Sequence, residues 1–241
     1  MSEGTSGADR GRMMPDGWHE FADGRAMAVA CAKSVADAID RALQSHGDAL
    51  LAFPGGSTPV EAFEILAEEP VDWERVTILP GDDRLVGWDD PLSNFAQLRG
   101  FFAKTGANLL PLFDGETEQV QAARQANEAL ARFDRPLDLV WLGVGGDGHT
   151  ASIFPGPDYA EALATTETTL VVRPDPLPPE APVARITLSP AAIRSAGHRM
   201  ISLRGPAKRE VLLKALADGD RSEFPVGRVM NDTDADFYWS P

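Results

Sequence analysis

The fold of this chain is decided by residues 137–152, LDLVWLGVGGDGHTAS, in which a continuous apolar run opens into a glycine-rich loop. The run at 137–142 predicts a buried β-strand, since short apolar runs bounded by glycine are typical of strands covered on both faces. The loop holds four glycines in six positions and ends in Asp-Gly-His. In an open parallel sheet, loops at the carboxyl ends of the strands are where ligands bind.

On both sides of this stretch, short apolar runs alternate with helical patterns along the chain. This alternation predicts an α/β fold, a single-domain, doubly wound, mostly parallel sheet with helices on both faces. Residues 1–17 are polar and lack periodicity, so we expect a disordered tail there and one domain over 18–241. Further strands are expected at 49–53, 76–79, 169–172, 185–188 and 200–203. Helices are expected near 20–45, 59–68, 91–103, 116–132 and 206–217.

The composition argues against some classes of binding partner. The 241 residues include 22 basic and 37 acidic side chains, which gives a net charge of −15, and 43% are hydrophobic. A nucleic-acid-binding protein needs a basic face and an anionic membrane repels an acidic one, so we expect neither partner. No run approaches the roughly 18 apolar residues of a membrane span, and the first residues do not resemble a signal peptide. Cys31 is the only cysteine and lies in an apolar helical stripe, which favours a buried thiol and a cytoplasmic location.

The loop FPGGSTP at 53–59 is the first of three candidate ligand loops. Gly55 and Gly56 allow the backbone to approach a ligand closely. Thr58 fits an N-cap with Pro59 at the first helical position, and Glu61 completes a capping-box pattern. A helix start of this kind suits an anion such as phosphate. An ordinary capped turn between a strand and a helix would show the same pattern.

The second loop, LPGDDR at 79–84, places two carboxylates and a guanidinium at the end of a strand. Arg84 is suited to bind a phosphate or carboxylate, and Asp82 or Asp83 to orient a histidine or a hydroxyl. A solvated turn with a local ion pair is the alternative. Asp90 and Pro91 then predict another helix start, with Asp90 as N-cap and Pro91 at the first helical position.

The third loop, at 143–152, carries the candidate general base. His149 has glycine on one side and small hydroxyl residues on the other, and imidazole suits base catalysis near neutral pH. Residues 143–148 match the letters G-x-G-x-x-G, but no clear helix follows, and the sequence has no Walker lysine and no metal-ligand spacing. Lys208 lies in the first turn of the helix expected at 206–217, where a cation opposes the helix dipole unless an anion lies nearby.

Taken together, these motifs resemble the 6-phosphogluconolactonase family, part of the broader glucosamine-6-phosphate isomerase/6-phosphogluconolactonase group. The resemblance covers roughly residues 20–240 and implies hydrolysis of 6-phospho-D-glucono-1,5-lactone to 6-phospho-D-gluconate in the oxidative pentose phosphate pathway. It implies no metal, no organic cofactor, and a small sugar-phosphate lactone as partner of a monomer or homodimer. The motifs that carry it are GGSTP at 55–59, DDR at 82–84 with Ser93-Asn94, GDGHTASIFPG at 146–156, RITLS at 185–189, and Gly205-x-x-Lys208.

The resemblance also implies roles for individual residues. His149 would activate the attacking water, and Asp82 and Asp147 would orient His149 or the sugar hydroxyls. Backbone N–H groups or Arg84 would stabilise the oxyanion. Asp83 stands where the family commonly has glutamate. The residues implied in substrate binding are Gly55, Gly56, Ser57, Thr58, Arg84, Gly146, Gly148, Arg185 and Lys208.

Because the implied substrate is an anion and the chain is acidic, we expect a local positive patch formed by Arg84, Arg185, Lys208 and the helix start after Gly56.

Two functions other than lactone hydrolysis are compatible with parts of the sequence. The deaminase branch of the group resembles D-G-H-I-A-F-N-E-P, with a glutamate coupled to the histidine. Here Phe154 occupies that position, and a phenyl ring cannot polarise an imidazole. A sugar-phosphate sensor would usually append a DNA-binding helix-turn-helix, and this sequence shows no basic N-terminal module.

Overall fold

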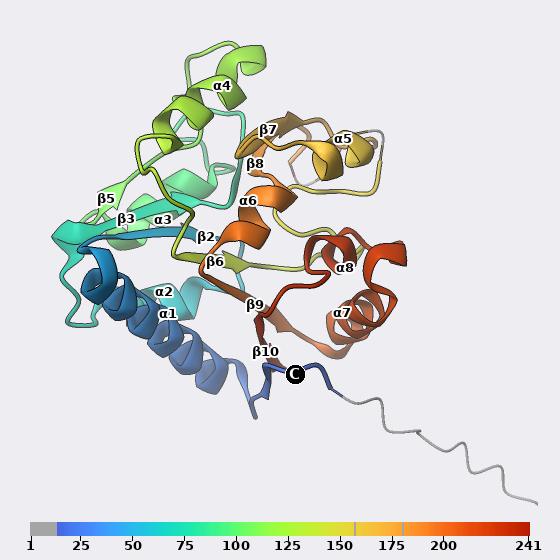
Figure 1. The fold of residues 1–241 in the computed structure, drawn as a ribbon, viewed down its shortest axis with the longest axis horizontal. Coiled ribbons are helices and arrows are strands. Elements are labelled where there is room, and N and C mark those ends of the chain that lie inside the picture. The colour runs from blue at the N-terminus through green and yellow to red at the C-terminus, as the bar shows by residue number, and fades with distance from the viewer. Residues whose placement is uncertain (1–13, 157, 180) are drawn as a thin grey trace, which may run out of the picture.

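A seven-stranded parallel sheet forms the centre of the computed structural model, which describes residues 14–156, 158–179 and 181–241 (Figure 1). The strand order is β1-β10-β9-β6-β2-β3-β5, and every neighbouring pair is parallel. The strands are β1 (Trp18–Glu20), β2 (Ala49–Phe53), β3 (Val76–Pro80), β5 (Asn108–Leu109), β6 (Leu139–Leu142), β9 (His198–Arg204) and β10 (Asp236–Ser240).

Both faces of this sheet are covered, which confirms the expected doubly wound architecture. Successive side chains of a strand point to opposite faces, so in β2 Leu51 and Phe53 enter one apolar cluster while Leu50 and Ala52 enter the other. The first cluster is closed by α1 (Gly24–His46), α2 (Val60–Ala67) and α3 (Asn94–Phe102). The second includes residues of α4 (Gln119–Leu130), α5 (Tyr159–Ala164), α6 (Pro190–Ser195), α7 (Pro206–Asp218) and α8 (Pro225–Val229).

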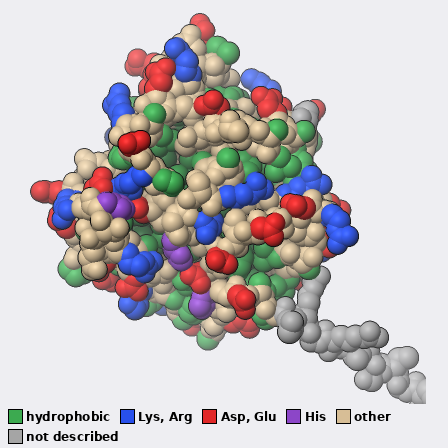
Figure 2. Space-filling view, in the orientation of Figure 1, with side chains coloured by type: hydrophobic (Ala, Val, Ile, Leu, Met, Phe, Trp, Pro, Cys, Tyr) green, Lys and Arg blue, Asp and Glu red, His purple; other side chains and the backbone are tan. Residues whose placement is uncertain are grey.

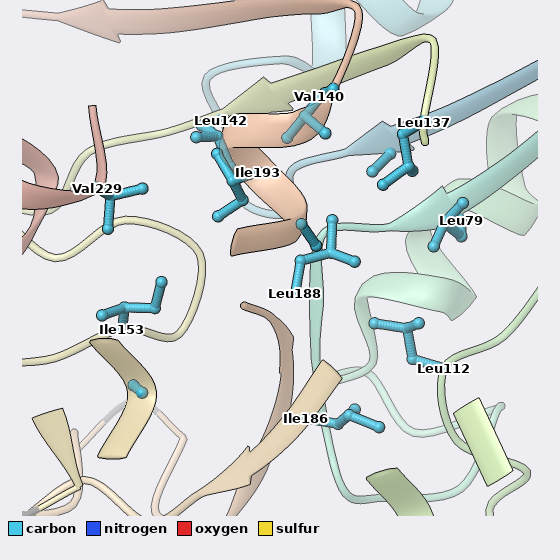
Figure 3. Packing of buried hydrophobic residues seen from close by; sticks show 14 of the residues in the cluster. Leu79, Leu112, Leu137, Val140, Leu142, Ile153, Ile186, Leu188, Ile193 and Val229 are labelled. Atoms are coloured by element: carbon cyan, nitrogen blue, oxygen red, sulfur yellow. The ribbon is translucent and has the colours of Figure 1, made fainter. Parts of the chain in front are cut away.

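The strands predicted at 169–172 and 185–188 form, but outside the parallel sheet. They are β7 (Thr169–Val172) and β8 (Arg185–Leu188), and with β4 (Asp82–Arg84) they make a three-stranded antiparallel sheet in the order β4-β8-β7. An apolar run predicts a strand but does not select its partner. Ile186 and Leu188 of β8 pack in one cluster with Val140 and Leu142 of β6 (Figure 3), so the two sheets share a core and form one domain.

The predicted helices and strands otherwise agree with the structure to within a few residues, but shorter elements were missed. α1 begins after Asp23, whose side chain accepts a hydrogen bond from the N–H of Ala26 at 2.8 Å. Cys31 is buried as expected, and burial raises the pKa of its thiol to about 12. The sequence did not predict β1, β4, β5, β10, α5, α6, α8 or two 3-10 helices at Trp73–Arg75 and Gly219–Arg221.

Most of the tail predicted at 1–17 lies outside the described residues, which begin at residue 14. Residues 16–17 form a turn into β1, and the carbonyl of Gly17 accepts a hydrogen bond from the N–H of Phe237. Across the described part of the chain, no helix has both the length and the apolar character needed to cross a membrane. Acidic and basic side chains are interspersed on the face shown in Figure 2.

Candidate active site

A cleft of about 460 Å³ opens at the carboxyl ends of the central strands. Strands β2 and β6 are neighbours in the sheet. The strands that follow β2, namely β3 and β5, lie on one side of this pair, whereas those that follow β6, namely β9 and β10, lie on the other. Ligands bind at such a switch point in open α/β sheets. The lining consists of Pro54, Gly55, Gly56, Ser57, Thr58, Pro59, Gly81, Asp82, Arg84, Asn94, Trp141, Leu142, Gly143, Val144, Gly145, His149, Ala151, Ser202 and Lys208.

The glycine loop after β2 is fastened to helix α3. Gly56 has a φ of +86°, a conformation that glycine adopts at no steric cost. Its N–H donates to Oε1 of Gln97 at 3.1 Å, and Nε2 of Gln97 donates to its carbonyl at 2.8 Å. A Cβ on Gly55 would fall 1.9 Å from Oδ1 of Asn94, so only glycine permits this close approach. Both glycines are therefore required to seat the loop on α3.

The helix start after this loop differs from the predicted capping box. α2 begins at Val60 with Pro59 as its N-cap residue, and no side chain caps it. The carboxylate of Glu61 instead pairs with Arg25 at 3.2 Å and with Arg204 at 3.5 Å. Those two cations offset a charge that would otherwise oppose an anion at the helix start. Thr58 is released from capping and lines the cleft together with Ser57.

Asp82 and Arg84 lie in the cleft and are both held by Asn94. Nδ2 of Asn94 donates to the carbonyl of Asp82 at 2.7 Å, while its Oδ1 accepts from Nη1 of Arg84 at 2.6 Å. The hydroxyl of Ser152 donates to Oδ2 of Asp82. The loops after β3 and β6 are thereby joined through Asp82, and Arg84 is held in a fixed position at the edge of the cleft.

Asp83 points away from the cleft and caps helix α3. Its side chain is 3% exposed and accepts hydrogen bonds from the N–H groups of Asn94 at 2.6 Å and Phe95 at 3.0 Å. Burial raises its pKa to about 6, although the hydrogen bonds from these backbone N–H groups act in the opposite direction.

The predicted helix start at Asp90 and Pro91 is wrong, because α3 begins at Asn94 with Ser93 as its N-cap. Asp90 instead accepts from the N–H of Leu92 in the preceding turn.

His149 is paired with Asp147. Oδ1 of Asp147 lies 2.6 Å from Nδ1 of the imidazole and also accepts from the N–H of His149 at 3.1 Å. Burial opposes ionisation of Asp147, but the hydrogen bond and positive charge of His149 outweigh it and lower the pKa of Asp147. A Cβ on Gly145 would fall 2.3 Å from two atoms of the imidazole, so the loop backbone packs directly against the ring. The side chain of His149 remains 31% exposed at the rim of the cleft.

Lys208 lines the cleft from helix α7. It lies in the first turn of α7, which begins at Pro206 after Gly205, as the sequence predicts. With Arg84 it provides two cations around a cleft that also contains the carboxylate of Asp82. Within the residues described by the structure, no group of three or more histidine, cysteine, aspartate or glutamate side chains is placed to hold a metal ion.

The sequence model described as glucosamine-6-phosphate isomerases/6-phosphogluconolactonase matches residues 22–239. The chain belongs to this family. A 6-phosphogluconolactonase of Pseudomonas putida is 36% identical over 230 residues, which cover 92% of each chain. One of Neisseria meningitidis is 34% identical over 220 residues, 89% of this chain and 94% of its own. The crystal structure of a 6-phosphogluconolactonase from Shewanella baltica has a TM-score of 0.85 at 32% identity and covers 93% of this chain and 97% of its own.

Three residues implied in substrate binding by the family motifs lie away from the cleft surface. Arg185 is 2% exposed in β8, where Nη2 donates to the carbonyl of Ala181 and the guanidinium lies 5.0 Å from the centre of the Phe154 ring. Gly148 is buried with a φ of +76°, and a Cβ there would fall 2.6 Å from Phe224. Gly146 is exposed but does not line the cleft. The expected positive patch is therefore formed by Arg84, Lys208 and the start of α2.

Four further residues hold the cleft in shape, although the sequence alone did not predict a role for them. Asn94 and Gln97 lie three residues apart on α3 and hold the first two loops. Ser152 holds Asp82, and Phe154 lies against His149. Asn94, Ser152 and Phe154 lie within the family motifs, but a motif does not say which atoms its residues contact. No pattern in the sequence singled out Gln97.

Proposed function

We propose that this protein hydrolyses 6-phospho-D-glucono-1,5-lactone to 6-phospho-D-gluconate, the second step of the oxidative pentose phosphate pathway. The observation that carries the proposal is the Asp147–His149 pair at the rim of a cleft that also presents Arg84 and Lys208. Membership of the family and the similar 6-phosphogluconolactonases support the same activity. We propose that the protein is cytoplasmic, because its single cysteine, Cys31, is buried and free, as is usual in a reducing compartment.

In this proposal, His149 is the general base. Ionised Asp147 can only accept a hydrogen bond, so Nδ1 of His149 donates to it and the lone pair remains on Nε2. Nε2 removes a proton from water as the water oxygen attacks C1 of the lactone. When the tetrahedral intermediate collapses, the bond between C1 and the ring oxygen breaks and the imidazolium returns the proton to that oxygen. The product is the open-chain acid, which ionises at neutral pH.

The negative charge that develops on the carbonyl oxygen needs hydrogen-bond donors at the cleft. The loop 143–149 lies with its backbone against the His149 ring, and Gly143 and Gly145 both line the cleft. The N–H of Gly145 already donates to the carbonyl of His149 at 2.9 Å, so the oxyanion would need another N–H of this loop. Backbone N–H groups held in place by a loop stabilise an oxyanion without reorganising during the reaction. We assign the oxyanion to this loop, and the orientation of the sugar hydroxyls to Asp82.

The phosphate group is assigned to the other end of the cleft. Ser57 and Thr58 supply hydroxyl groups next to the N-terminus of α2, while Lys208 and Arg84 supply positive charge. The ion pairs of Glu61 with Arg25 and Arg204 reduce its repulsion of an anion there. A small cluster of cations is sufficient for an anionic ligand even though the protein carries a net charge of −15.

The test is hydrolysis of freshly generated 6-phosphogluconolactone, measured against spontaneous ring opening in the same buffer. We expect the protein to accelerate acid release and His149→Ala to reduce the rate to the spontaneous one. A parallel incubation with glucosamine 6-phosphate should release no ammonia. Ammonia release without lactone hydrolysis would contradict the proposal and assign the protein to the deaminase branch.

A further inference from the structure

The ring of Phe154 lies against the imidazole of His149 in a tilted arrangement. The two ring centroids are 4.3 Å apart and the ring planes are inclined by 32°. A tight turn directs Phe154 back toward the histidine, because the N–H of Ile153 donates to the carbonyl of Thr150 and Ala151 adopts a φ of +48°. Buried Ile153 anchors this turn in the core. The contact between the rings is therefore set by the fold of the loop.

Arg185 supports Phe154 from the interior. Its guanidinium lies 5.0 Å from the centroid of the Phe154 ring, within the range of a cation–π interaction. Arg185 is 2% exposed and belongs to β8, which pairs with β4 on one side and β7 on the other. The cation that the family motifs placed in substrate contact thus acts on an aromatic ring next to the histidine.

We propose that Phe154 is a positioning residue that holds the His149 imidazole in its working orientation, and that Arg185 holds Phe154 in turn. This inference rests on the proposed function of His149. The hydrogen bond from Nδ1 to Asp147 fixes where that nitrogen lies, but the imidazole can still tilt about this bond. The face of Phe154 and the backbone of Gly145 restrict that tilt and keep Nε2 directed at one point in the cleft.

The first test is kinetic. Phe154→Leu removes the aromatic face, and kcat should fall by roughly 10-fold to 100-fold with KM changed less than about twofold, because small misplacements of a catalytic group slow the chemical step without weakening binding. Phe154→Tyr keeps the ring and should restore most of kcat. Phe21→Leu is the matched control, since Phe21 stacks on Tyr238 outside the cleft and its loss should leave kcat unchanged.

The second test does not depend on activity. The chain has four histidines, and the Hε1 resonance of His149 is assigned by its disappearance in His149→Gln. A stacked phenyl ring displaces that resonance by its ring current, so Phe154→Leu should move it toward the position of a free imidazole, whereas Phe154→Tyr and Phe21→Leu should not. If Phe154→Leu fails to fold, Phe154→Met provides the same two measurements.

The proposal is overturned if Phe154→Leu keeps wild-type kcat, or if its Hε1 resonance stays at the wild-type position. An equal loss of kcat in Phe21→Leu would also overturn it, since the effect would then be general destabilisation. If the wild-type protein does not hydrolyse the lactone, the proposed function fails, and the resonance still decides whether Phe154 orients His149.

Discussion

Oδ1 of Asp147 lies 2.6 Å from Nδ1 of His149, two residues away in the same loop after β6. This pairing decides between the two carboxylates suggested by the sequence, since Asp82 is bound to Ser152 and Asn94. A carboxylate at Nδ1 selects one tautomer of the imidazole and, in the proposed mechanism, stabilises the imidazolium that forms when His149 accepts a proton.

Asp147→Asn should lower kcat by roughly 100-fold or more, because the neutral amide no longer selects the tautomer that leaves Nε2 as base. Steady-state kinetics on fresh lactone measure this fall in kcat. Asp89→Asn is the control, because Asp89 forms an ion pair with Arg99 at the surface. Wild-type kcat in Asp147→Asn would exclude the pair from the mechanism.

His149→Ala should abolish lactonase activity while its thermal melting and its affinity for 6-phosphogluconate stay close to wild type. The side chain lies at the rim of the cleft and is 31% exposed, so its removal leaves space that opens to solvent and no cavity in the core. Progress curves should match spontaneous opening, and calorimetry gives the affinity. His19→Gln is the control and should remain active, because His19 pairs with Asp236 outside the cleft. Near-wild-type turnover in His149→Ala would show that another base serves.

Lys208→Met should raise KM by roughly 10-fold to 100-fold with little change in kcat, the effect of losing one charge-assisted hydrogen bond to a phosphate. The increase should become smaller at high salt, which screens the charge already in the wild type. Lys214→Met is a matched control in the same helix, where Lys214 pairs with Glu223. Unchanged KM in Lys208→Met would mean that Lys208 faces solvent in the complex.

Gln97→Leu should raise KM roughly 3-fold to 10-fold. It removes two hydrogen bonds worth about 1 kcal/mol each, so the melting temperature should fall by no more than a few degrees. Those bonds hold Gly56 in its φ of +86° at the end of the cleft that we assign to the phosphate. Gln121→Leu, at a glutamine bonded to Arg124 on α4, should leave KM unchanged. A fall in kcat at constant KM would instead place Gln97 with the reacting groups.

Asp83 should make stability depend on pH. Its pKa is about 6 in the folded protein against an ordinary value of 3.8, so its contribution to the unfolding free energy is complete below about pH 4 and is lost as the pH rises through about 6. Urea unfolding of the wild type and Asp83→Asn from about pH 4 to about pH 7 isolates this group. The wild-type advantage should shrink by up to about 3 kcal/mol over that interval. A constant difference between the two proteins would contradict the raised pKa.

Local sequence predicted the elements best where burial and periodicity act within a few residues. The strands at 49–53, 169–172 and 185–188 match β2, β7 and β8 to the residue. Helix starts were less predictable, because a cap depends on where the neighbouring side chains bind. Glu61 pairs with two arginines from distant elements, and Asp83, 11 residues earlier in the chain, accepts from the N–H of Asn94, where α3 begins three residues later than predicted.

The order of residues was enough to predict the parallel α/β framework, the three loops at the ends of β2, β3 and β6, and His149 as the candidate base. These follow from alternation of apolar runs with helical patterns and from residue types within single loops. The pairing of Asp147 with His149, the contact of Arg185 with Phe154 from a second sheet, and the hydrogen bonds of Gln97 to Gly56 become visible in three dimensions alone. The last two contacts join residues 31 and 41 positions apart. Such pairs are created by packing of whole elements, which no local pattern of residues records.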